Sequence, residues 1–221
     1  MKSSMIKKIL GCFKANKAIF VSAFVVLLGS SALAFFQINQ PDITTDESIK
    51  NASSLFSQGK EDEAISLLES AYAKDKADQS LAKKLADYYF QTNNYDRFVT
   101  IADEANLVDA DTYVMRAYIC RESGDQSKAI EYYTKAIAIN PKSTSTYVTF
   151  ANYYSVLGQI DQALLIIQSG LSGNPKSSTL NLLAANYSLK LSDKVGAKKY
   201  ARAVLEVNAS NIQAQDIIDS Q

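Results

Sequence analysis

The sequence of 221 residues predicts an all-α chain in which one N-terminal transmembrane helix precedes a solenoid of helix-turn-helix repeats. Three observations lead to this fold class. Only 8 glycines and 3 prolines are present, too few for the many tight turns of a β fold. Apolar residues recur with the spacing of helix faces, and small and turn-forming residues recur with a longer, regular period. An apolar run without any charged residue, 18–36, lies close to the N-terminus.

The N-terminal region predicts a membrane topology. Residues 1–17 form a basic head with five lysines and no acidic residue. Residues 18–36, AIFVSAFVVLLGSSALAFF, approach the length of about 20 residues needed to cross the hydrocarbon core. Because positive charge is retained on the cytoplasmic side, we expect the head in the cytoplasm. The chain that follows a short linker, 37–44, is then expected outside it.

Residues 18–36 also fit a second interpretation. Ala32-Leu33-Ala34 has the small-residue pattern of a cleavage site, so the segment is either a retained signal-anchor or a cleaved signal peptide. Both alternatives deliver the rest of the chain to the same compartment. The basic head and the A-x-A pattern suit a bacterial inner membrane. The repeats are then expected in the periplasm, on a single-pass protein or, after cleavage, as a soluble one.

Composition argues against enzymatic chemistry. Histidine is absent, which removes imidazole bases and His-ligated metal sites. Cys12 and Cys120 lack metal-ligand spacing and lie on opposite sides of the apolar segment, so no disulfide is expected. The head holds five of the 23 basic residues and none of the 23 acidic ones, so the remainder is mildly acidic and a poor match for nucleic acid. We therefore expect that the protein is not an enzyme and that it binds no cofactor, metal or small-molecule substrate.

Several residue types recur with a 34-residue period. The recurring positions are Asn140-Pro141, Asn174-Pro175 and Asn208-Ala209; Ala117, Ala151 and Ala185; Ala129, Ala163 and Ala197; and Gly124, Gly158 and Ser192. A single helical hairpin cannot bury its apolar face alone, so such units stack on one another. The predicted repeats are 45–78, 79–109, 110–143, 144–177 and 178–211, the second three residues short, followed by a capping helix in 212–221.

This pattern resembles the tetratricopeptide repeat (TPR). The fourth unit has suitable residue types at the signature positions of that repeat: Tyr147, Phe150, Ala151, Tyr154, Gly158, Ala163, Ile167 and Pro175. The resemblance extends over residues 45–211. It implies a membrane-anchored, bacterial-type TPR protein that binds a protein or peptide on the concave face formed by the first helix of each unit.

By the same resemblance, one side of each first helix faces the groove. The candidate partner-binding residues are Lys83, Asp87, Phe90, Tyr118, Arg121, Val148, Asn152, Asn186, Leu189 and Lys190. Asn152 and Asn186 hold equivalent positions, where an amide either contacts a peptide backbone or is simply solvated. Some relatives clamp a C-terminal carboxylate with a Lys and an Asn of one first helix. Here Lys83 is followed by Asp87, and Asn152 is preceded by Val148, so no such clamp is expected.

The sequence therefore predicts a non-enzymatic, membrane-tethered TPR scaffold or adaptor. It is expected to bind a protein or peptide partner on the extracytoplasmic side. There it assists the assembly or stability of an envelope complex of the secretion, pilus, translocon, cytochrome maturation or polysaccharide export type. Two alternatives stay open: a permanent structural subunit of a large membrane machine, and a regulatory partner of a membrane glycosyltransferase.

Overall fold

The computed structural model describes residues 44–220. The chain divides into two compact units between Asn51 and Ala52, inside its first described helix. The predicted basic head (1–17), the predicted membrane segment (18–36) and linker residues 37–43 lie outside the described residues. Within residues 44–220, none of the helices combines the length and the apolarity that crossing a membrane requires.

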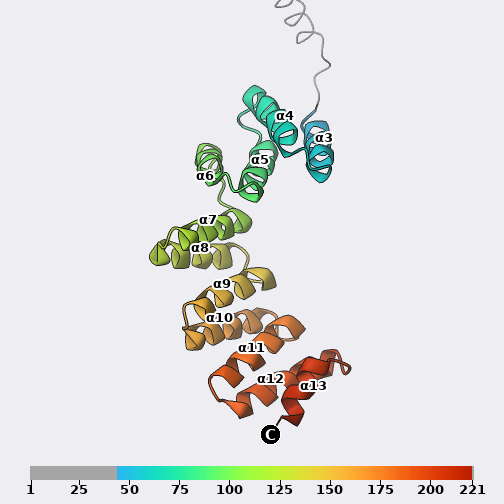
Figure 1. Ribbon diagram of the computed structural model, residues 1–221, viewed down its shortest axis with the longest axis vertical. Helices are drawn as coiled ribbons and strands as arrows, with labels where there is room; N and C mark the ends of the chain where they lie inside the picture. Colours follow the sequence, from blue (N-terminus) through green and yellow to red (C-terminus); the bar gives the residue numbers. More distant parts are fainter. Residues whose placement is uncertain (1–43, 221) are drawn as a thin grey trace, which may run out of the picture. The chain divides into compact units, whose positions relative to one another are not determined.

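Residues 44–220 form eleven α-helices and no strand (Figure 1). The helices are α3 (Thr45–Ser57), α4 (Glu61–Lys74), α5 (Gln79–Gln91), α6 (Tyr95–Glu104), α7 (Ala110–Glu122), α8 (Gln126–Ile139), α9 (Thr144–Val156), α10 (Ile160–Gly173), α11 (Ser178–Lys190), α12 (Lys194–Val207) and α13 (Ile212–Asp219). The prediction of an all-α solenoid is confirmed for this part of the chain. Two helices fall within each predicted repeat range, and α13 falls within the predicted cap.

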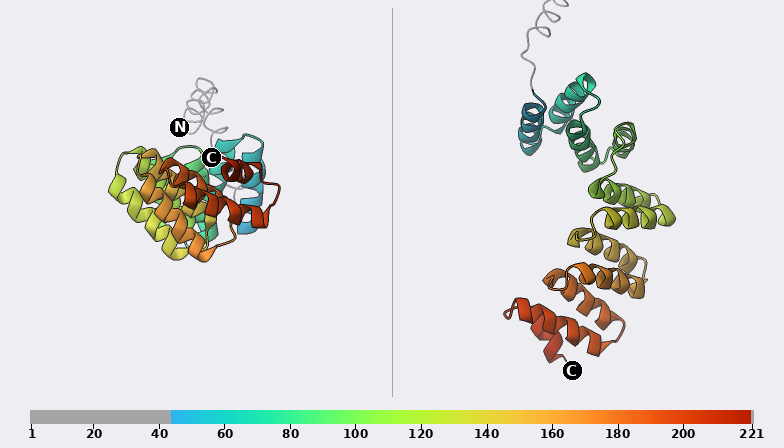
Figure 2. Two further views of the ribbon diagram at one scale, coloured as in Figure 1. Left: turned by 90° about the horizontal axis from the view of Figure 1, so that it is seen from below. Right: turned by 180° about the vertical axis from the view of Figure 1, so that it is seen from behind.

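From α4 onward, each helix packs against the next one along the chain. In addition, α9 contacts α11 and α11 contacts α13, so the first helices of the fourth and fifth hairpins lie side by side and the capping helix lies next to the second of them. Figure 2 shows the same succession of hairpins from two further directions. Each hairpin thereby covers the apolar face of its neighbour, as in other solenoids.

The turn inside each hairpin is built around one residue with positive φ. These residues are Gly59, Asn93, Gly124, Gly158 and Ser192, with φ between 59° and 80°. Glycine adopts this left-handed conformation without steric cost, and asparagine tolerates it. Ser192 occupies the place that glycine holds in the two preceding hairpins, at the position given by the 34-residue spacing.

The second hairpin is shortened in its second helix. Helix α6 has 10 residues, whereas α4, α8, α10 and α12 have 14 each. It ends at Glu104, and Asp109 already caps the start of α7. Helix α6 is thus four residues shorter, while the connection from α6 to α7 is one residue longer than the other connections between hairpins, which together give the three missing residues.

Small residues lie where the two helices of a hairpin meet. Ala117 and Ala129 in the third hairpin, and Ala151 and Ala163 in the fourth, are all 0 % exposed. Large aromatic residues fill the space between hairpins. Tyr133 of α8 stacks on Phe150 of α9 with ring centroids 4.9 Å apart. The core is therefore continuous across the junction of the third and fourth hairpins.

Helix α10 contains a glycine that the packing requires. A Cβ at Gly170 would lie 2.8 Å from Cγ of Tyr147 and 3.1 Å from Cδ1 of Leu180. Alanine is favoured over glycine in a helix by about 0.8–1.0 kcal/mol, but overpacking a core costs about 1–3 kcal/mol. Since Tyr147 is buried and the clash is at the base of its ring, the cost of overpacking should exceed the gain in helix propensity.

We expect Gly170→Ala to lower the free energy of unfolding by about 1–2 kcal/mol. Gly173→Ala is the matched control, because its Cβ would meet only the carbonyl oxygen of Pro141, at 3.4 Å. Urea unfolding followed by circular dichroism measures both. A Gly170→Ala variant as stable as the control would contradict the close approach of α9 and α11 to α10.

Candidate partner-binding groove

The first helices of the second, third and fourth hairpins line a cavity that is partly open to solvent. It has a volume of about 330 Å³ and is lined by residues of α5, α7 and α9: Phe90, Asp111, Val114, Met115, Tyr118, Ser145, Thr146 and Thr149. The lining combines aromatic and aliphatic groups with hydroxyls and one carboxylate. Ligand sites have this character, with apolar walls for burial and a few polar groups for orientation.

The aromatic wall of the cavity joins the second hairpin to the third. The ring of Phe90 on α5 meets the ring of Tyr118 on α7 edge to face, with centroids 5.4 Å apart. Tyr95, the first residue of α6, packs against these two rings at 5.6 and 6.2 Å. The Arg121 guanidinium lies 4.3 Å from the centre of the Tyr118 ring and forms an ion pair with Glu122. The charge of Arg121 is therefore compensated within α7.

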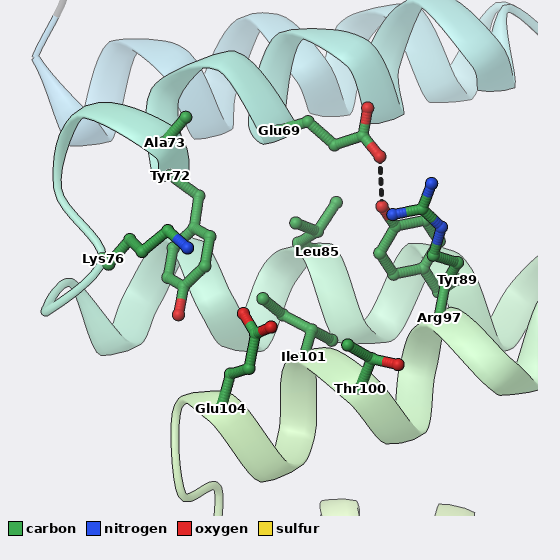
Figure 3. Close-up of a pocket in the computed structure, with 10 residues that line it drawn as sticks. All are labelled: Glu69, Tyr72, Ala73, Lys76, Leu85, Tyr89, Arg97, Thr100, Ile101 and Glu104. Carbon is green, nitrogen blue, oxygen red and sulfur yellow. Dashed lines mark hydrogen bonds between the residues drawn. The ribbon is translucent and has the colours of Figure 1, made fainter.

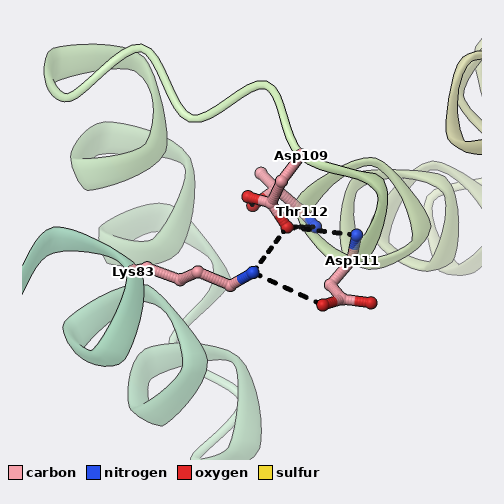
Figure 4. Close-up of polar contacts among 4 residues, drawn as sticks. All are labelled: Lys83, Asp109, Asp111 and Thr112. Carbon is pink, nitrogen blue, oxygen red and sulfur yellow. Dashed lines mark hydrogen bonds and ion pairs between the residues drawn. The ribbon is translucent and has the colours of Figure 1, made fainter. Parts of the chain in front are cut away.

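An ion-pair cluster also links α5 to the start of α7 (Figure 4). The Lys83 ammonium binds Asp109 at 2.9 Å and Asp111 at 3.4 Å. Asp109 caps α7, because its carboxylate accepts hydrogen bonds from the backbone N–H groups of Asp111 and Thr112 and from the Thr112 hydroxyl. Burial opposes ionisation of Asp109, but the bonds from Thr112 and Lys83 outweigh it and hold the pKa of Asp109 below its ordinary value.

Asp87 lies on the same face of α5, one turn after Lys83 and one turn before Phe90. Its side chain is partly buried, and among residues 44–220 it has neither a hydrogen bond nor an ion pair. Burial raises the pKa of Asp87 above its ordinary value, and the positive charges of Lys83 and Lys84 offset this only in part. Asp87 is thus a carboxylate beside the cavity that has lost water without gaining a partner.

The predicted residues of α9 and α11 do not line this cavity. Val148 packs against the hydrophobic core of the fourth hairpin. Asn152 accepts a hydrogen bond of 2.9 Å from the Tyr187 hydroxyl, so its amide also has a structural contact. The Lys190 ammonium lies 5.6 Å from the centre of the Tyr187 ring. Asn186 and Leu189 are exposed.

The ten predicted residues therefore separate into two groups. Phe90 and Tyr118 line the cavity, with Lys83, Asp87 and Arg121 around it, while the other five line no part of it. Six lining residues are not among the ten candidates: Asp111, Val114, Met115, Ser145, Thr146 and Thr149. The 34-residue period could have pointed to some of these residues. It separates Asp111 from Ser145 and Met115 from Thr149, so each pair holds equivalent positions in α7 and α9.

A second cavity of about 330 Å³ lies among α4, α5 and α6 (Figure 3). The Tyr89 hydroxyl donates a hydrogen bond to the Glu69 carboxylate inside it. Burial and this bond raise the pKa of Tyr89 far above its ordinary value, so the hydroxyl stays protonated. The charges of Glu69 and Glu104 are balanced by those of Lys76 and Arg97, so the lining has no net charge. No cluster of potential metal ligands is found in residues 44–220.

Three profiles of the tetratricopeptide repeat match the sequence, at residues 55–117, 110–143 and 132–164. No curated protein matches it. Several solved structures share the fold. YrrB, a TPR protein with an unusual peptide-binding site, is 15 % identical, with a TM-score of 0.55 over 83 % of this chain and 95 % of its own. MamA is 18 % identical, with a TM-score of 0.57 over 70 % of this chain and 92 % of its own.

The C-terminal part of a TPR repeat-containing protein from Cytophaga hutchinsonii is also similar. It is 18 % identical, with a TM-score of 0.61 over 77 % of this chain and 71 % of its own. At such identities the structural likeness establishes the fold alone. Together with the matches between residues 55 and 164, it shows that the chain carries tetratricopeptide repeats folded into an α-solenoid.

Proposed function

We propose that this chain is a membrane-tethered TPR scaffold or adaptor that binds a protein or peptide partner in the cavity between α5, α7 and α9. The observation that carries the proposal is the cavity itself, where Phe90, Val114 and Tyr118 present an apolar surface from two successive first helices. Tyrosine, phenylalanine and methionine are enriched at protein interfaces because they bury large areas at modest entropic cost.

The fold supports the same use of this surface. Tetratricopeptide repeats form protein-interaction scaffolds and are generally not enzymes. The peptide-binding site described for YrrB, which shares the fold, is consistent with a peptide or protein partner here. A cavity of about 330 Å³ is at the lower end of the range of about 300–1,000 Å³ for small-molecule sites, so it suits one or two side chains of a larger partner.

The tether in this proposal is the apolar segment 18–36, which follows the five lysines of the head. The positive charge keeps residues 1–17 in the cytoplasm and directs the repeats to the other side of the membrane. On that side the scaffold assists the assembly or stability of an envelope complex. Cleavage after Ala34 would release the same domain as a soluble periplasmic protein without changing its compartment.

Crosslinking from the cavity in intact cells tests the binding site. A photoreactive amino acid at Met115, which lines the cavity, is expected to give a discrete crosslinked product with a partner protein. The same amino acid at Thr134, exposed on α8, serves as the matched control and is expected to give none. Equal products from both positions, or a product from Thr134 alone, would exclude the cavity as the docking site.

Reporter fusions after Gln221 test the compartment. A phosphatase that requires the periplasm should be active, whereas a fluorescent protein that matures only in the cytoplasm should stay dark. The reverse pair of results would remove the envelope role from the proposal and leave the cavity as a cytoplasmic binding site. The size of the membrane-bound product then separates a retained anchor from a form cleaved after Ala34.

A further inference from the structure

We propose that the cavity between α5, α7 and α9 selects partner segments in which a lysine or arginine lies next to an apolar side chain. This inference rests on the proposed function, because it specifies the chemistry of the partner that the cavity binds. It depends on two features that adjoin one another, an apolar cavity and a carboxylate that has neither an ion pair nor a hydrogen bond among the described residues.

The apolar half of the partner follows from the cavity lining. Phe90, Val114, Met115 and Tyr118 supply the walls, and the hydroxyl-bearing residues of α9 form one border. The rings of Phe90 and Tyr118 already pack edge to face, so the wall is held in place before a ligand arrives. A preformed wall of this kind buries an aromatic or long aliphatic side chain at a low cost in conformational entropy.

The basic half follows from how the charges beside the cavity are paired. Three carboxylates, those of Asp87, Asp109 and Asp111, lie around Lys83, and Lys84 is the second ammonium group whose charge acts on Asp87. Lys83 forms ion pairs with Asp109 and Asp111 but none with Asp87. The next cation along α5, Lys84, lies over the Tyr88 ring at 4.7 Å. Asp87 thus has neither an ion pair nor a hydrogen bond among the described residues, and three carboxylates against two ammonium groups leave the surroundings of the cavity net negative at this end.

The side chains at the other end of the cavity do not cancel this net negative charge. The guanidinium of Arg121 forms an ion pair with Glu122 and also packs on Tyr118, so it offers no free cation to an acidic ligand. An acidic segment would meet Asp87 and Asp111 as like charges and would be disfavoured. A cation placed beside Asp87 restores the interactions that this partly buried carboxylate lost with water, and the nearby aromatic rings add to the attraction.

A selection experiment on the full chain tests this chemistry. Random short peptides displayed on phage are selected on the full-length protein, and the enriched peptides are synthesised with a fluorescent label. We expect enrichment of sequences in which Lys or Arg lies beside an aromatic or aliphatic residue. Each selected peptide is paired with an analogue whose basic residue is replaced by glutamine, and binding is measured by fluorescence anisotropy.

Variants of the protein separate the inference from the proposed function. Asp87→Asn keeps the shape of the side chain and should weaken the basic peptides about tenfold, because charge-assisted hydrogen bonds are roughly twice as strong as neutral ones. It should leave the glutamine analogues unchanged. Asp62→Asn, on the exposed start of α4, changes the net charge equally and should have no effect. Tyr118→Ala should abolish binding of every peptide, and unchanged circular dichroism confirms that the variants are folded.

Each outcome has one meaning. Basic peptides that lose affinity with both Asp87→Asn and Tyr118→Ala support the inference. Peptides that depend on Tyr118, but show no preference for a basic residue and no response to Asp87→Asn, overturn the inference and leave the proposed function intact. Peptides whose binding is unaffected by Tyr118→Ala, or the absence of any enriched peptide, overturn the cavity as a peptide-binding site and the inference with it.

Discussion

Tyr133→Ala is expected to lower the free energy of unfolding by about 3–5 kcal/mol, the range for removing a large aromatic side chain from a core. Tyr133 is 0 % exposed and is the largest fully buried side chain among residues 44–220. Its ring stacks on Phe150 at 4.9 Å and tilts against Tyr153 at 5.9 Å. Since Tyr133 belongs to α8 and its two partners to α9, the substitution removes packing that couples the third hairpin to the fourth.

The matched control is Tyr133→Phe, which is not expected to lower the free energy of unfolding. The Tyr133 hydroxyl is buried and has no hydrogen-bond partner among the described residues. An unpaired buried hydroxyl costs about 1–3 kcal/mol, so removing it should leave stability unchanged or raise it by up to about 1 kcal/mol. Urea unfolding followed by circular dichroism measures both variants. A phenylalanine variant as unstable as the alanine one would show that the hydroxyl, and not the ring, carries the effect.

The 34-residue spacing identified features that depend on the local backbone. Gly124, Gly158 and Ser192 recur because each hairpin turn needs one residue with positive φ, and the structure shows that conformation at all three. Asn93 makes the same turn in the second hairpin, but an asparagine is common outside turns and gave no such signal. The alanine positions were also predictable, because only a small residue fits at the place where the two helices of each hairpin meet.

The groove was only partly predictable, because its chemistry depends on pairs of residues from different repeats. Periodicity assigns Lys83, Asp87 and Phe90 to one face of a helix. It does not show that Lys83 forms its ion pairs with Asp109 and Asp111, so that Asp87 has none. That distinction requires the relative position of α5 and α7, which lie in different repeats. Likewise, the contact of Asn152 with Tyr187 joins two repeats and has no signature in either.

The alanines that recur with the 34-residue period also predict a second large effect on stability, in the fourth hairpin. Ala151 on α9 and Ala163 on α10 are both 0 % exposed and belong to one core cluster with Ile167 and Tyr187. The two alanines are fully buried where α9 and α10 meet, so a leucine at either place is expected to push the helices apart. Overpacking of this kind costs about 1–3 kcal/mol when side chains adjust and more when backbones must move.

We therefore expect Ala151→Leu and Ala163→Leu each to lower the free energy of unfolding by about 3 kcal/mol, since rigid helices flank both positions. Ala138→Leu, at an exposed position of α8, is the matched control and should change stability by less than about 0.5 kcal/mol. Urea unfolding of the three variants and the parent makes the comparison. Because repeats interact only with their neighbours, the two core variants should also loosen the fourth hairpin first. Hydrogen exchange should then rise in α9 and α10 before it rises in α5. Core variants that unfold together with the control would mean that α9 and α10 do not meet at these two alanines.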